Sequence, residues 1–61
     1  MTNNTGAWYL TMMRQAKTSA VANALAESYL TWLDEMPVYR VPVQLECRAF
    51  DHLLTLERMG R

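Results

Sequence analysis

The stretch Pro37-Val38-Tyr39-Arg40-Val41-Pro42 divides the 61-residue chain into two parts. A proline cannot continue a helix, and it disfavours helical geometry in the residue before it. We therefore expect a helix on the N-terminal side to end near Glu35 or Met36. Pro42 suits the first turn of a second helix, where its missing N–H costs nothing, and Gly60 is a natural end for that helix. The sequence predicts two helices joined by a short loop.

The second predicted helix, about residues 42–59, carries apolar side chains in two neighbouring seams on a helical wheel. The first seam contains Val43, Cys47, Phe50 and Leu54. The second seam contains Leu45, Ala49, Leu53 and Leu56. So wide an apolar arc exceeds what one partner helix covers, which implies two neighbours. We expect Phe50 and Leu54 to be buried and Cys47 to be a small core residue.

Residues 21–36 form a strongly amphipathic pattern, but residues 7–20 place their apolar groups on nearly the opposite side. Either the chain breaks near Lys17-Thr18-Ser19, where Thr18 or Ser19 would cap a new helix, or one helix is continuous. Because no Gly or Pro occurs there, we expect a continuous helix over residues 7–36. Its N-terminal end would then contact a second copy of the chain.

The predicted fold is an all-α antiparallel helical hairpin that forms a single domain over residues 1–61. Cys47 is the only cysteine and His52 the only histidine, so neither an intrachain disulfide nor a closed zinc site of Cys and His is available. A chain this short then needs an oligomeric partner, and two copies would make a four-helix arrangement. The candidate residues for a dimer or partner interface are Trp8, Tyr9, Met12, Met13, Leu45, Ala49, Leu53 and Leu56.

Composition excludes several classes of function. Six basic and six acidic residues give a formal charge of zero, so nothing attracts nucleic acid or an anionic membrane at long range. The N-terminus lacks the pattern of a signal peptide and no stretch reads as a membrane span, which favours a cytoplasmic protein. We find no phosphate loop, paired carboxylates or nucleophile motif, so we expect no enzyme and no cofactor, with His52 solvated or at an interface rim.

The main rival interpretation is a dimeric DNA-binding transcriptional regulator. Thr18, Ala22, Ala26 and Trp32 loosely follow helix-turn-helix spacing. The recognition helix would be residues 28–35, which carry two acids and no base, whereas a groove-reading helix needs donors. The basic residues are scattered in sequence, although folding would still be able to gather some of them.

Tyr39 and Arg40 in the loop are open to partner contact, or the tyrosine ring folds back over the hairpin.

Two segments carry a family resemblance. Residues 1–10, Met-Thr-Asn-Asn-Thr-Gly-Ala-Trp-Tyr-Leu, and residues 41–54, Val-Pro-Val-Gln-Leu-Glu-Cys-Arg-Ala-Phe-Asp-His-Leu-Leu, resemble very short early proteins of lambdoid bacteriophages. Those proteins are encoded between the exonuclease and excisionase genes. The resemblance covers the whole chain through size, composition and overall sequence, but it has no diagnostic motif and transfers no functional residue. It implies a small regulator in the host cytoplasm that acts on a host protein or the lysis–lysogeny choice.

Overall fold

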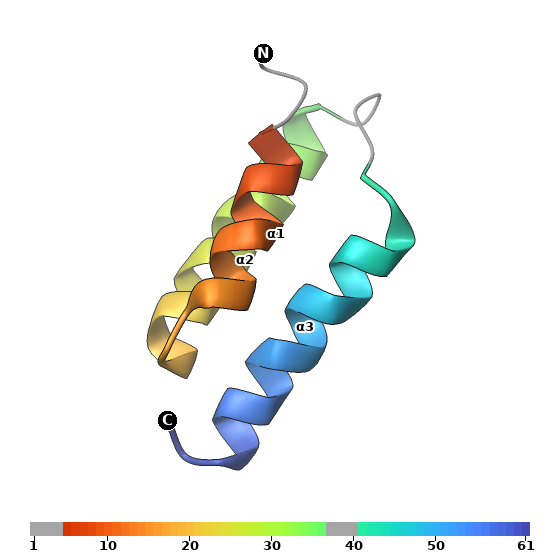
Figure 1. Cartoon of the computed structure of the whole chain (residues 1–61). Coiled ribbons are helices and arrows are strands. Elements are labelled where there is room, and N and C mark those ends of the chain that lie inside the picture. The colour runs from red at the N-terminus through yellow and green to blue at the C-terminus, as the bar shows by residue number, and fades with distance from the viewer. Residues whose placement is uncertain (1–4, 37–40) are drawn as a thin grey trace.

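The computed structural model describes residues 5–36 and 41–61, and all regular structure within them is helical. Helix α1 spans Thr5–Gln15, α2 spans Ser19–Glu35 and α3 spans Val43–Arg58 (Figure 1). The expectation of an all-α chain is confirmed. The expected two-helix hairpin is wrong in number, because the described residues form three helices. A dimer of such chains would contain six helices rather than four.

The chain breaks between α1 and α2, so the expected continuous helix over residues 7–36 is wrong. Thr18 adopts an extended conformation (φ −132°, ψ 152°), and its Oγ1 accepts a hydrogen bond of 3.3 Å from the Val21 N–H. Such a cap stabilises a helix start by about 0.5–2 kcal/mol. The break lets α1 turn back along α2, so that Leu10 and Met13 are fully buried in the core. Packing within the chain replaces the second copy that a continuous helix would have needed.

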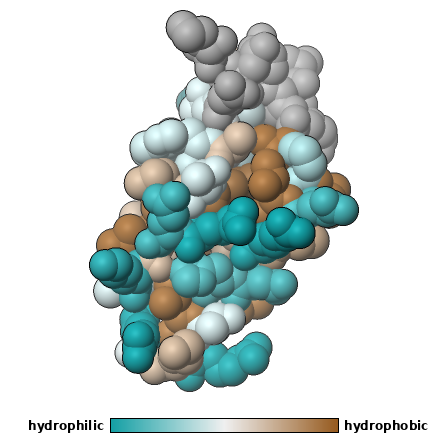
Figure 2. Space-filling model, in the orientation of Figure 1, coloured by the Kyte–Doolittle hydropathy of each residue, from teal (hydrophilic) through white to brown (hydrophobic). Residues whose placement is uncertain are grey.

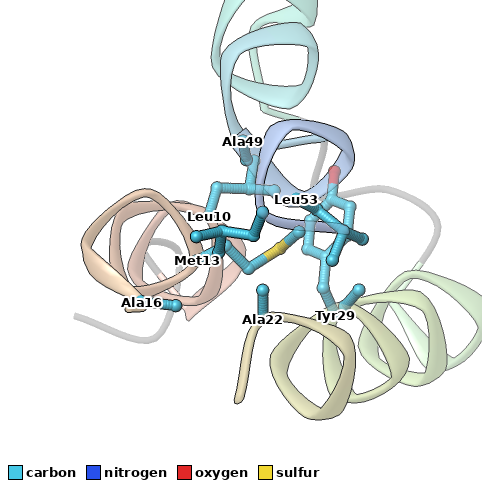
Figure 3. Close-up of a cluster of buried hydrophobic side chains, with 9 residues drawn as sticks. Leu10, Met13, Ala16, Ala22, Tyr29, Ala49 and Leu53 are labelled. Carbon is cyan, nitrogen blue, oxygen red and sulfur yellow. The ribbon is translucent and has the colours of Figure 1, made fainter. Parts of the chain in front are cut away.

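The core lies where the three helices meet (Figure 3). Small residues allow close approach, and larger side chains fill the space between the helices. The buried side chains are Leu10, Met13 and Ala16 near α1, Ala22, Ala26 and Tyr29 on α2, and Ala49, Leu53 and Leu56 on α3. α1 packs against both other helices, whereas α2 and α3 contact each other less.

Side-chain hydrogen bonds link α2 to α3. The Tyr29 hydroxyl donates to a carboxylate oxygen of Glu46, which satisfies the polar end of a ring that is otherwise buried. Nearer the start of α2, the Asn23 side-chain amide donates to Glu57 at 3.2 Å. The pairs lie at different heights along the helices and fix how α2 and α3 are aligned.

The two seams of α3 have different environments. In the second seam, Ala49, Leu53 and Leu56 are buried against the other helices. In the first seam, Cys47 is exposed and Leu54 is 52% exposed, so the expectation that both are buried is wrong. The reason is that both neighbours, α1 and α2, pack on the side of the second seam. Within residues 5–36 and 41–61 there is no fourth helix to cover the other side.

The helix ends follow the expected signals. α2 ends at Glu35, and α3 begins directly after Pro42. Gly60 follows the last turn of α3 with φ +74°, and the Arg61 N–H donates to the Leu56 carbonyl at 2.9 Å, the bonding pattern of a Schellman motif. The expectation that Gly60 ends this helix is confirmed.

A backbone hydrogen bond joins the start of α2 to the C-terminal residue, beyond the end of α3. The Ser19 N–H donates to the Arg61 carbonyl at 2.7 Å. The bond satisfies one of the amides that the first turn of α2 leaves without a partner inside the helix. Figure 1 accordingly shows the C-terminus beside the beginning of α2.

Candidate functional site

An apolar stripe on α3 lies beside the core and is largely exposed. We call it the α3 seam: Val43, Cys47, Phe50 and Leu54. Val43 is 68% exposed, and Phe50 is half-buried with its ring tilted against Tyr29 at a centroid distance of 6.4 Å. The spacing of four, three and four residues is typical of helices that pack along their length. The seam therefore has the pattern of a helix–helix contact, but three of its four residues, Val43, Cys47 and Leu54, are exposed.

A second surface is a shallow, open groove of about 530 Å³ between α1 and α2. We call it the α1/α2 groove, and its lining is Tyr9 from α1 and Ala24, Glu27, Ser28, Thr31, Trp32 and Glu35 from α2. Two aromatic rings, three hydroxyls and two carboxylates thus share one concave surface. Every fully charged side chain of the lining is acidic.

The aromatic rings of the groove are held in place by their neighbours. The Trp32 ring lies against Gly6 of α1, where a Cβ would come within 2.5 Å of the ring atom Cζ3. The ring also stacks on Tyr29 at a centroid distance of 6.2 Å. On the other wall, Trp8 contacts Tyr9 edge-to-face at 5.2 Å. These contacts pre-organise the groove, because its rings have few alternative positions.

Folding gathers four basic side chains of a formally neutral chain at one end of the molecule, where Glu57 also lies. Arg14 and Arg58 lie in the last turns of α1 and α3, and Lys17 lies in the turn before α2. The bond between Ser19 and Arg61 brings a fourth basic residue to the same end. Figure 2 shows hydrophilic side chains at this end, the lower end in that view. We call these four residues the basic end.

α2, in contrast, carries acidic residues and no basic one. Its charged residues are Glu27, Asp34 and Glu35. Its outer face therefore has the opposite sign to the basic end, although the chain as a whole carries no formal net charge.

His52 has a structural environment rather than a solvated one. Its ring is half-buried, and Nε2 lies 2.7 Å from the Ala16 carbonyl oxygen. A carbonyl oxygen only accepts, so Nε2 carries the hydrogen and donates it. The expected solvated position is therefore wrong, because His52 links the end of α1 to α3, whereas its place at an interface rim stays a prediction. In residues 5–36 and 41–61, no three His, Cys, Asp or Glu side chains gather to hold a metal ion.

The structure separates the interface residues that the sequence suggested. Trp8 is 54% exposed, and Tyr9 and Met12 are half-buried. Leu45 is half-buried against the core. The remaining four are buried in the core of the chain itself: Met13, Ala49, Leu53 and Leu56. Of these candidates, only Tyr9 lines the α1/α2 groove. The two loop residues offered for partner contact, Tyr39 and Arg40, fall outside the described residues.

Sequence reasoning missed the polar part of the groove. Glu27, Ser28, Thr31 and Glu35 lie on the polar half of the helical wheel, where solvation is the ordinary expectation. They become the wall of a groove because α1 turns back beside them. The signal that predicts this arrangement is the pair of opposed apolar stripes on either side of Thr18.

No protein-family model, curated protein or solved structure matches the chain. Within the part of the chain that the structure describes, no helix has the length and apolar character needed to cross a bilayer.

Proposed function

We propose that the chain is a small non-enzymatic regulatory protein that acts by protein–protein contact and self-associates through the α3 seam. The observation that carries the proposal is the exposure of that seam, whose spacing is typical of packed helices. Burying one side chain such as Val43 or Leu54 contributes about 1.5–3 kcal/mol when burial is complete. The resemblance to short early phage proteins supports a host protein as the further partner, in the host cytoplasm.

An antiparallel pairing of two α3 helices suits the seam best. Val43 then lies opposite Leu54 of the partner subunit, and Cys47 lies opposite Phe50 of the partner subunit. In a parallel pair, Glu46 would face Asp51 of the partner subunit across the flank, and like charges at such positions are destabilising. The antiparallel arrangement avoids this repulsion and buries the whole stripe.

Sedimentation of matched α3 variants tests the self-association. Leu54→Glu puts a charge into the seam, whereas Thr55→Glu puts the same charge at the next residue, which is exposed outside the seam. We expect dimers for the unmodified chain and for Thr55→Glu at tens of micromolar, and monomers for Leu54→Glu. The Thr55 hydroxyl donates only to the Asp51 carbonyl of its own helix, so the control leaves the core intact. A 7.1 kDa particle at every concentration of the unmodified chain would overturn the proposal.

The basic end favours a second candidate, a dimeric DNA-binding regulator. Arg14, Lys17, Arg58 and Arg61 lie at one end of the molecule, where they would contact phosphates without reading bases. An electrophoretic shift assay at low salt tests this candidate against the double variant Lys17→Glu/Arg58→Glu. Retardation that the double variant abolishes would support DNA binding. No retardation of the unmodified chain at micromolar concentration would exclude it.

A further inference from the structure

We propose that the α1/α2 groove binds an extended, arginine-containing segment of a partner protein. This inference rests on the proposed function in one respect: it takes the partner to be a protein. It adds the site at which the partner binds and the chemistry that the site selects. The site is separate from the α3 seam, since its lining comes from α1 and α2 alone.

The charge of the groove selects a cation. Glu27 and Glu35 lie in the lining and no Lys or Arg does, and α2 carries no basic residue along its whole length. The two glutamates are eight residues apart, which corresponds to about 12 Å along a helix. An extended peptide advances about 3.3 Å per residue, so basic side chains four residues apart reach both carboxylates. The spacing predicts a segment of the form Arg-x-x-x-Arg.

The aromatic rings favour arginine over lysine. The planar guanidinium stacks on the faces of Trp and Tyr and also forms paired hydrogen bonds with a carboxylate. Trp32 lies between the two glutamates in the sequence of α2, and Tyr9 lines the groove from α1. The hydroxyls of Ser28 and Thr31 add hydrogen-bond acceptors on the same wall. The rings offer a stacking surface, and the carboxylates and hydroxyls offer hydrogen-bond acceptors. Together they match the flat face and the N–H donors of a guanidinium.

The shape of the groove sets the size of its ligand. A volume of about 530 Å³ accommodates a short segment with its side chains, and the groove is open along one side. The rings are already fixed by Gly6, Tyr29 and Trp8, so binding orders little of the protein. We therefore expect a local contact that adds to the affinity of a larger interface.

A peptide titration followed by amide chemical shifts tests the proposal. The probe is acetyl-Arg-Gly-Ser-Gly-Arg-amide, and the control peptide has glutamine in place of both arginines. We expect the arginine peptide alone to bind, with the largest shifts at Tyr9, Ser28 and Thr31. Equal binding of the glutamine peptide, or shifts centred outside the groove, would overturn the proposal.

Matched charge variants separate recognition from general attraction. Glu27→Gln/Glu35→Gln removes the two groove carboxylates, and Asp34→Asn/Asp51→Asn removes two exposed acids outside the lining. Both variants change the net charge equally. We expect the groove variant to bind the arginine peptide about three- to tenfold more weakly and the control variant to bind it less than twofold more weakly. Equal weakening in both variants would refute a specific site.

The result is independent of the test of self-association. Peptide binding is measured on the groove, and sedimentation without peptide reports on the α3 seam. A monomer that binds the arginine peptide at the groove would contradict the dimer and support this inference. A dimer that does not bind the arginine peptide would support self-association and contradict this inference.

Discussion

Replacing Leu53 and Leu54 by alanine, one at a time, separates the core face of α3 from its exposed face. The two residues are adjacent in sequence and chemically identical, so the change in helix propensity is the same for both. Leu53 is 7% exposed in the core, whereas Leu54 is 52% exposed on the α3 seam. Any difference between the two variants therefore measures the difference in environment.

The magnitudes follow from these environments. Truncating a buried leucine costs about 2–5 kcal/mol, which we expect for Leu53→Ala. Complete burial of a leucine contributes about 1.5–3 kcal/mol and Leu54 is only half covered, so we expect about 1 kcal/mol or less for Leu54→Ala in the monomer. At about 0.05–0.15 kcal/mol per residue, a chain of 61 residues has a total stability of about 3–9 kcal/mol. Leu53→Ala therefore removes a large fraction of that stability.

Urea unfolding followed by far-ultraviolet circular dichroism measures both variants. At concentrations where the chain is monomeric, we expect a much lower midpoint for Leu53→Ala and a nearly unchanged one for Leu54→Ala. At higher concentrations, where the proposed dimer forms, the Leu54→Ala variant loses the extra stability that the unmodified chain gains. Equal losses for both variants in the monomer would mean that α3 is rotated about its axis relative to the structure, and the reasoning would be refuted.

Three further variants probe single contacts. Thr18→Ala removes the cap of α2 and should lower the free energy of unfolding by about 0.5–2 kcal/mol in urea unfolding, while Thr18→Ser retains most of it; equal loss in both would contradict the cap. His52→Ala leaves the Ala16 carbonyl without its donor and should cost about 1 kcal/mol by the same measurement; an unchanged midpoint would show that the bond contributes nothing. Gly6→Ala drives a methyl group into the Trp32 ring and should shift the fluorescence emission of Trp32. The measurement is made with Trp8→Phe in the background, and an unaltered spectrum would rule out the close contact.

The sequence predicts the individual helices of this fold well where local signals are strong. The prolines and Gly60 place the end of α2 and both ends of α3 within a residue or two of where they lie. These signals act through backbone geometry, which depends on few neighbours. The pattern of residues 42–59 likewise identifies a helix with two apolar seams.

The break before Thr18 was harder to predict, because a threonine cap is a weaker signal than a proline or a glycine. A continuous helix keeps more backbone hydrogen bonds locally. The broken chain is favoured by burial of Leu10 and Met13, which becomes visible only in three dimensions. The apolar stripes of residues 7–20 and 21–36, which lie on opposite sides of a continuous helix, are the feature of the sequence that indicates the break.

Periodicity also could not decide which seam of α3 is buried. Both seams are apolar, and the choice depends on where α1 lies after the break. Periodicity alone therefore predicts that Leu54 and Cys47 lie in the core, and it does not indicate the α1/α2 groove. The polar residues of α2 form a groove wall only because α1 turns back beside them. A continuous helix over residues 7–36 lacks that turn, so it predicts neither the α1/α2 groove nor the exposure of the α3 seam.

The bond between the Arg61 carbonyl and the Ser19 amide ties the stability of two distant helix ends together. Gly60 tolerates the left-handed turn that aims this carbonyl, and a side chain at that position would oppose the turn. Loosening of the last turn of α3 therefore also removes a hydrogen-bond partner from the first turn of α2. We therefore expect fraying at one of these ends to promote fraying at the other, although more than forty positions of sequence lie between them.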